Sequence, residues 1–191
     1  MFEQKLFFGA SAAAARGGLL LLLTAAAFGV AAQTEPANKP QVADLGTGIP
    51  DAAMIKEGLF PEDACEELVK SGFKCMGFKP AVTFSLPAVA FAVGSAVLPD
   101  ALKRQLDVFA EVLIAKRGSP QKVHVVGHAD SSGSDAANTA LSKRRADEVK
   151  RYLVGKGVDG NLLDTQGVGS RDLIKPDAPT SAENRRVTLG R

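Results

Sequence analysis

Two charged residues in the second half of the chain, Asp130 and Arg145, have the types and spacing for holding a charged ligand. Asp130 lies in residues 127–134, which have no apolar period and which we interpret as a loop. The valine-rich residues 123–126 before this loop are typical of a central strand. Ser134 is suited to cap a helix after the loop, because its hydroxyl can accept a bond from a free backbone N–H.

Arg145 falls on the apolar side of this predicted helix, four residues from both Leu141 and Val149. An unpaired charge buried there costs several kcal/mol, so the guanidinium must extend to water or meet an acid. Asp130, at the end of the preceding strand region, is the natural acid. Two interpretations stay open, a structural ion pair and a pair that binds a ligand.

Several short motifs follow one another in this half of the chain. They are Gly-His-Ala-Asp at 127–130, Gly133-Ser134, Asn138, Leu-Ser-Lys-Arg-Arg-Ala at 141–146, Val149 with Tyr152-Leu153, Gly167-Val168-Gly169-Ser170 and Asn184-Arg185-Arg186-Val187. Through them, residues 81–191 resemble the C-terminal domain of outer membrane protein A and its relatives, the OmpA/MotB-like domains. Ala129 is a departure, since the family usually has threonine there; it removes a hydroxyl but no charge.

The resemblance implies a protein that binds peptidoglycan without catalysis, by holding the free end of diaminopimelate in the stem peptide. Carried over by position, Asp130 and Arg145 are the key pair, with Asn138 and Arg185 assisting. The chemistry agrees, because that end has an ammonium and a carboxylate on one carbon. An aspartate beside an arginine is its complement. Fixing both between a strand end and a helix lowers the ordering cost of binding.

Composition suits one modest domain with appendages: 191 residues, 46% of them hydrophobic, with no Trp and one Tyr. The formal net charge is only +2. No basic stretch dominates, which argues against nucleic acid as a partner.

Residues 1–32 have the pattern of a signal peptide. Lys5 and Arg16 supply positive charge, and residues 17–32 are almost wholly apolar. This run is shorter than the roughly 20 residues that a spanning helix needs, and small residues precede Gln33. We therefore expect cleavage after Ala32; a retained anchor is the alternative. The run contains no acid, which disfavours a MotB-like proton-conducting stator.

Between this segment and the resembling domain lie two further regions. Residues 33–50 are rich in Pro and Gly and are predicted to be a flexible linker. Residues 51–80 are predicted to be a short separate unit with a helix that begins near Pro61. In an exported chain its two cysteines, Cys65 and Cys75, indicate a disulfide. A metal pair and free buried thiols are the alternatives.

Residues 81–191 are predicted to be an α+β two-layer sandwich in the order β-α-β-α-β-β. Four strands form a mixed sheet, and two main helices cover one face. Pro87 interrupts the first extended segment, residues 81–93. The first helix has a core stripe at Leu102, Leu106, Phe109 and Leu113. The last two strands are expected at 162–168 and 186–189.

The sequence gives little support for catalysis or for a bound cofactor. His128, Asp130 and a nearby serine are triad residue types, but one short loop could hardly align them. His124 and His128 are a weak metal pair, and the loop lacks the acids of a calcium site. We expect no enzyme activity, cofactor or metal, and a place in the periplasm on the cell wall, at or near the outer membrane. The alternative is an assembly subunit whose domain mainly docks an envelope protein.

Overall fold

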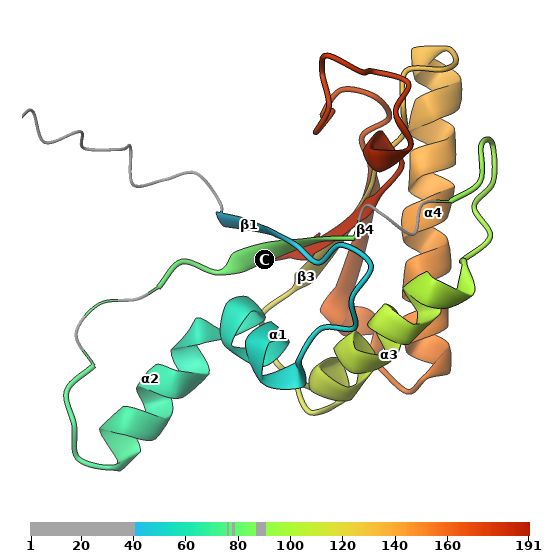
Figure 1. Ribbon diagram of the computed structural model, residues 1–191. Helices are drawn as coiled ribbons and strands as arrows, with labels where there is room; N and C mark the ends of the chain where they lie inside the picture. The colour runs from blue at the N-terminus through green and yellow to red at the C-terminus, as the bar shows by residue number, and fades with distance from the viewer. Residues whose placement is uncertain (1–40, 76, 78, 87–90) are drawn as a thin grey trace, which may run out of the picture. The chain divides into compact units, whose positions relative to one another are not determined.

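The computed structural model describes residues 41–75, 77, 79–86 and 91–191 (Figure 1). All of them belong to one compact unit. The predicted signal peptide, residues 1–32, and the first part of the predicted linker lie outside the described residues.

A mixed five-stranded sheet forms one layer of the unit, in the order β1-β2-β5-β3-β4. The strands are β1 (Gln41–Asp44), β2 (Val82–Leu86), β3 (Val123–Gly127), β4 (Leu163–Gly167) and β5 (Val187–Gly190). β1 runs parallel to β2, and β3 runs parallel to β4. β5 lies between the two pairs and is antiparallel to both neighbours. The sheet therefore brings the C-terminal strand into the middle of the domain.

Helices form the second layer (Figure 1). They are α1 (Ala52–Leu59), α2 (Pro61–Lys70), α3 (Asp100–Ile114) and α4 (Asp135–Gly155), with 3₁₀ turns η1 (Gly160–Leu162) and η2 (Ala182–Asn184). The Phe84 ring of β2 packs edge-to-face on Phe109 of α3, with centroids 5.7 Å apart. The same ring closes over Gly58 of α1. Since one side chain meets both helices, α1 and α3 cover the same face of the sheet.

The predicted architecture is confirmed from β2 onward, where the elements follow the order β-α-β-α-β-β. β2 ends at Leu86, directly before Pro87, and Ser134 caps α4 by accepting a bond from the Ala137 N–H at 3.3 Å. The predicted core stripe of α3 is buried, with Leu106, Phe109 and Leu113 all 0% exposed. These features are local, so the sequence pattern is enough to predict them.

The predictions for residues 41–80 differ from the structure in two ways. The sheet has a fifth strand, because β1 pairs with β2 inside the region predicted as linker. This strand lacks an apolar alternation; it is held by backbone pairing to an edge that would otherwise be open. The second difference is α1, whose Ile55 and Leu59 are fully buried in the common core, so residues 51–80 are not a separate unit.

The predicted disulfide is present: Cys65 of α2 is bonded to Cys75, and their Cα atoms are 5.4 Å apart. α2 itself contributes no buried residue to the core. Among the described residues, no helix is both long and apolar enough to cross a bilayer.

Two glycines let α4 lie directly on the sheet. Gly127 of β3 and Gly167 of β4 are register partners across the parallel pair. A Cβ at Gly127 would lie 1.9 Å from the Ser142 carbonyl oxygen, and one at Gly167 would lie 2.3 Å from the Lys143 nitrogen. The nearest atoms in both cases are backbone atoms of α4, so a rearrangement of side chains could not make room for a Cβ. This contact fixes where the start of α4 sits beside the end of β3.

We expect Gly127→Ala to lower the free energy of unfolding by about 1–3 kcal/mol or more, the usual cost of overpacking. Gly155→Ala is the matched control, because a Cβ at Gly155, the last residue of α4, meets nothing within 4 Å. Urea unfolding followed by circular dichroism measures both. Equal midpoints for the two variants would contradict the close approach.

Candidate functional site

A pocket of about 240 Å³ lies where β3 ends and α4 begins. All four residues that the sequence singled out, Asp130, Asn138, Arg145 and Arg185, line it. Arg144 and Ser132 line it as well. The pocket thus collects three guanidinium groups and one carboxylate from three separate segments of the chain.

Asp130 is held as a buried anion, with 7% of its side chain exposed. Its Oδ2 accepts a 2.8 Å bond from Nη1 of Arg185, and its Oδ1 accepts from the Ser132 N–H at 3.0 Å and from the Ser132 hydroxyl. Burial acts to raise the pKa of Asp130, but the bonds from Ser132 and Arg185 outweigh it and leave the pKa below its ordinary value. The carboxylate is therefore charged at neutral pH.

Arg145 is 0% exposed and lies against the pocket. Its Nε donates to the Ser95 carbonyl at 2.9 Å, Nη1 to the His128 carbonyl at 3.1 Å and Nη2 to the Ala92 carbonyl at 3.3 Å. The Phe91 ring lies 4.8 Å from the guanidinium carbon. Burial lowers the pKa of Arg145 to about 10, with a further lowering by the charge of Arg185. It remains a cation at neutral pH.

Of the two interpretations that the sequence left open, the structural ion pair between Asp130 and Arg145 is not what the structure shows, because Asp130 pairs with Arg185 instead. The N–H groups of Arg145 donate instead to backbone carbonyls, and two of these carbonyls belong to the segment that follows β2. That segment is 50 residues or more away in sequence. The residue pattern of the helix gives no sign of these distant carbonyl partners. The two predicted residues share a pocket without a direct bond.

Arg185 reaches the pocket because a neighbouring asparagine orders the loop before β5. The Asn184 amide, 0% exposed, accepts from the Lys175 N–H at 3.0 Å and donates to the Ala178 and Pro179 carbonyls at 3.0 and 3.1 Å. Arg185 then donates through Nε to the Phe91 carbonyl at 3.0 Å, besides binding Asp130. The sequence motif pointed to this asparagine, but its role in holding the loop emerges only from the fold.

His128 precedes the pocket residue Ala129 in the chain and is 3% exposed. Its Nδ1 is 3.4 Å from an Asp172 carboxylate oxygen, and Asp172 also binds the buried Arg186 at 2.9 Å. Burial, and then the charge of Arg186, lower the pKa of His128 to about 4, although Asp172 acts in the opposite direction. His124 is exposed on β3. Within the described part of the chain, no cluster of three His, Cys, Asp or Glu residues is placed to hold a metal ion.

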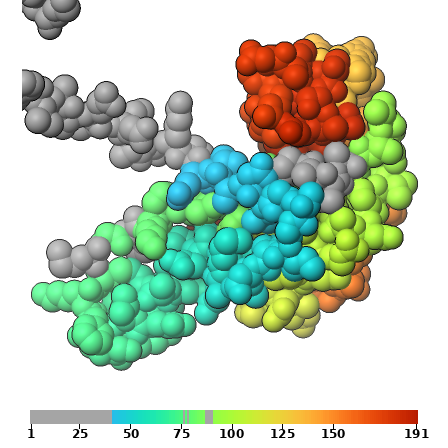
Figure 2. Space-filling view, in the orientation of Figure 1, coloured from blue at the N-terminus to red at the C-terminus, as the bar shows by residue number. Residues whose placement is uncertain are grey.

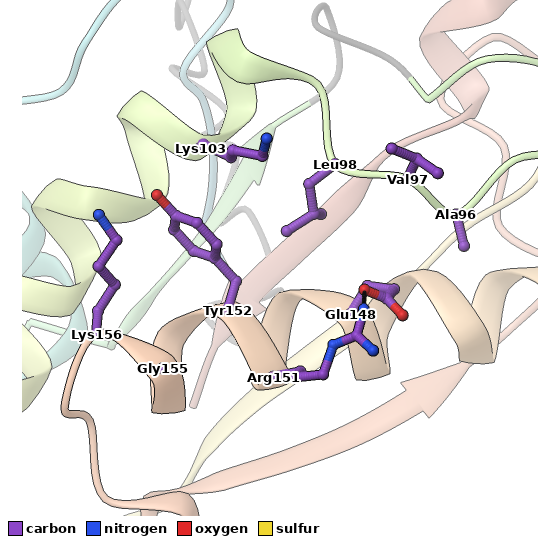
Figure 3. A pocket seen from close by; sticks show the side chains of 9 residues that line it. All are labelled: Ala96, Val97, Leu98, Lys103, Glu148, Arg151, Tyr152, Gly155 and Lys156. Carbon is purple, nitrogen blue, oxygen red and sulfur yellow. Dashed lines mark hydrogen bonds and ion pairs between the residues drawn. The ribbon is translucent and has the colours of Figure 1, made fainter.

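A larger pocket of about 590 Å³ lies between α3 and α4 and is lined by Tyr152, Val97 and Leu98 (Figure 3). Each of its three cations already has an acid as partner: Lys103 with Asp100, Arg151 with Glu148, and Lys156 with Asp107. Its charges are balanced internally. The smaller pocket holds three cations against one anion, so it is the better candidate for a charged ligand.

A two-layer α+β domain with a charged pocket at the end of a central strand is the class that the fold and the site define. The chain belongs to the OmpA family, whose model matches residues 90–186, slightly more than half of the chain. The match includes Asp130, Asn138, Arg145 and Arg185.

Individual relatives agree. The chain is 34% identical over 152 residues to outer membrane protein P5 of Haemophilus influenzae. This alignment covers 78% of this chain and 38% of that protein. It is 41% identical over 93 residues to the peptidoglycan-associated lipoprotein of Pseudomonas aeruginosa, covering 48% and 53%. The solved OmpA-like domain of FopA1 from Francisella tularensis superimposes with a TM-score of 0.50 at 25% identity, over 56% of this chain and 69% of that one. The alignments thus span only about half, or less, of these two sequence relatives.

We expect Arg145→Lys to lower the free energy of unfolding by about 2–3 kcal/mol. A lysine ammonium lacks the planar fork, and each buried carbonyl left unpaired costs about 1–3 kcal/mol. Arg144→Lys is the matched control, since the Arg144 side chain is exposed, and it should stay within about 0.5 kcal/mol of the parent. Chemical denaturation gives both values. An unchanged midpoint for Arg145→Lys would mean that its three bonds do not hold the domain together.

Stability should also fall between about pH 6.5 and pH 4 because of His128. Its pKa is about 4 in the folded chain and about 6.5 when unfolded, so the unfolded chain binds the extra proton in this window. The stabilisation, about 3 kcal/mol at most, is complete above the unfolded pKa and is lost as the pH falls to the folded one. His128→Gln should flatten the pH dependence of the unfolding free energy, whereas the exposed control His124→Gln should leave it as in the parent. The same slope in all three proteins would show that His128 is not the group responsible.

Proposed function

We propose that this protein binds peptidoglycan without catalysis and anchors an envelope component to the cell wall. The ligand group is the zwitterionic end of diaminopimelate in the stem peptide. The observation that carries the proposal is the gathering of Asp130 with Arg144, Arg145 and Arg185 around one small pocket. A carboxylate and several guanidinium groups complement an ammonium and a carboxylate on one carbon.

The charge of the pocket favours a ligand with a carboxylate. Three guanidinium groups face one aspartate, and the charges of Arg185 and Arg144 both act to lower the pKa of Arg145. This lowering means that the cations repel one another. A ligand carboxylate would relieve that repulsion. The first turn of α4, with Ala137 and Asn138, also lines the pocket and presents the positive end of the helix dipole.

Each pocket residue would have a different role in binding the ligand. Asp130 accepts from the ligand ammonium, and Arg185 and the exposed Arg144 bind its carboxylate. Arg145, being fully buried, acts on the ligand mainly through its charge and by holding the pocket walls in place. Asn138 is 4% exposed and its amide donates to the Gly133 carbonyl at 3.5 Å, so it supports the loop beside Asp130.

The location proposed for the protein is the periplasm, at the cell wall and near the outer membrane. The names of the relatives, an outer membrane protein and a peptidoglycan-associated lipoprotein, support this placement. The disulfide is consistent with an oxidising compartment. We infer that residues 1–32 direct export and that the chain is cut after Ala32.

We expect Asp130→Asn to weaken binding to purified sacculi about tenfold or more, because a charge-assisted contact is worth about 1.5–3 kcal/mol. The amide can still accept from the Ser132 N–H, and Arg185 keeps its bond to Phe91, so the fold should persist. Asp164→Asn, at an exposed position of β4, removes the same charge away from the pocket and is the control. Co-sedimentation with sacculi measures the affinity, and a melting curve for each variant checks the fold.

Competition separates the ligand chemistry from binding to the wall in general. Soluble meso-diaminopimelate should displace the parent protein from sacculi, whereas pentane-1,5-diamine, which keeps the amines and lacks the carboxylates, should not. If Asp130→Asn melts normally and binds sacculi like the parent, the pocket is not the binding site. If the parent protein does not bind sacculi at all, the result would favour the alternative in which the domain mainly docks a protein partner.

A further inference from the structure

The end of α2 and the turn that follows it carry exposed apolar side chains that the proposed function does not use. Leu68 is 47% exposed, Val69 58% and Phe73 66%. Lys70 and Lys74, both exposed, lie among them in the sequence. We call these five residues the α2 tip. Large apolar side chains gathered at one exposed place indicate a surface that something covers.

The α2 tip projects from a firmly held base. At the start of α2, Asp63 is paired with Lys116 and Glu62 with Arg191, so this end is tied to the body of the domain. Beyond it, the segment reaches away from the rest of the unit (Figure 1, and the lower left of Figure 2). The disulfide from Cys65 closes the ten-residue loop that contains the tip. The exposed apolar side chains are thus presented on a short, cross-linked projection.

The charged residues at and near the α2 tip indicate which kind of surface it can bind. Residues 68–99 contain three lysines and no Asp or Glu. Two of these lie near an acid, Lys79 with Glu57 at 3.0 Å and Lys70 with Glu66 at 3.9 Å, both pairs being well exposed to solvent. At 100° per residue, Glu62, Asp63 and Glu66 lie on the side of α2 away from Leu68, and Glu67 lies to its flank. The tip itself contains two lysines and no acid, with Lys70 and Lys74 on either side of the exposed Phe73 in the sequence.

We propose that the α2 tip docks on an anionic lipid surface. Phe73, Leu68 and Val69 enter the boundary between headgroups and acyl chains, and the two lysines approach the lipid phosphates. This combination of apolar and basic residues is what interfacial membrane binding requires. A bilayer suits a small convex projection because it deforms around it, whereas a protein partner would need a matching hollow.

This docking is independent of the wall-binding pocket. Figure 1 places α2 at the opposite end of the unit from the start of α4, where the pocket lies. A protein with both surfaces would touch lipid at one end and bind its other ligand at the other.

The chain has no tryptophan, so Phe73→Trp places a single fluorescent reporter on the tip of the full-length protein. With vesicles of equimolar phosphatidylglycerol and phosphatidylcholine we expect a blue shift and quenching by brominated lipid. With vesicles of phosphatidylcholine alone, or at high salt, the response should be much smaller. Val154→Trp reports on an exposed site of α4 away from the tip, and it should show neither change. Because each variant reports only on its own position, binding by any other part of the chain does not imitate the result.

Lys70→Glu with Lys74→Glu, in the Phe73→Trp background, should weaken partitioning about 30-fold or more, since each lysine near an anionic surface contributes about 1 kcal/mol. No fluorescence response of the Phe73→Trp variant to anionic vesicles would overturn the proposal, and so would an equal response to neutral vesicles. A blue shift without lipid that grows with protein concentration would identify a second copy of the chain as the occupant, and would also overturn it. Sacculus binding should be unchanged in all of these variants, so a failure of this proposal is distinct from a failure of the pocket.

Discussion

The buried guanidinium of Arg145 is the interaction on which the geometry of the pocket depends. It joins the Ala92 and Ser95 carbonyls on one side to the His128 carbonyl on the other, across 53, 50 and 17 residues of sequence. A cation at 0% exposure is tolerable only because carbonyl dipoles and the Phe91 ring replace water around it. The same bonds hold two walls of the pocket together. A charge that the sequence suggests as a binding residue thus has a structural role in the fold.

That arrangement requires α4 to lie very close to the sheet. The paired glycines Gly127 and Gly167 allow it, since any larger residue would collide with the helix backbone. Ser142, 0% exposed, accepts a 2.9 Å bond from the Gly169 N–H and so ties the same turn of α4 to the loop after β4. The contact explains how Arg145, one turn further along α4, reaches the carbonyls behind β3.

Arg185 and Arg186 show how neighbouring residues of one type take different roles. Arg185 turns to the pocket and binds Asp130, while Arg186, 3% exposed, binds Asp172 on the side of His128. Asn184 holds the preceding loop in place for both. Three consecutive polar residues therefore order the loop, line the pocket and bind Asp172 outside it. The bonds from Ser132 and from Arg185 keep Asp130 negatively charged, so these three residues act as a unit.

The sequence by itself determined the features that repeat or cap locally: the order of elements from β2 to β5, the cap at Ser134, the disulfide, and the residues that meet in the pocket. Periodicity suffices for the elements and the cap, because these depend on neighbours in the chain, whereas the disulfide follows from an exported chain with two cysteines and the pocket residues from the spaced motifs of the family resemblance. Only the tertiary structure decided that Asp130 pairs with Arg185, 55 residues away, and that Arg145 binds carbonyls. It also decided that β1 joins the sheet and that α1 belongs to the core. A buried charge takes whichever partner the packing brings within reach, and an edge strand pairs by backbone groups that every sequence shares.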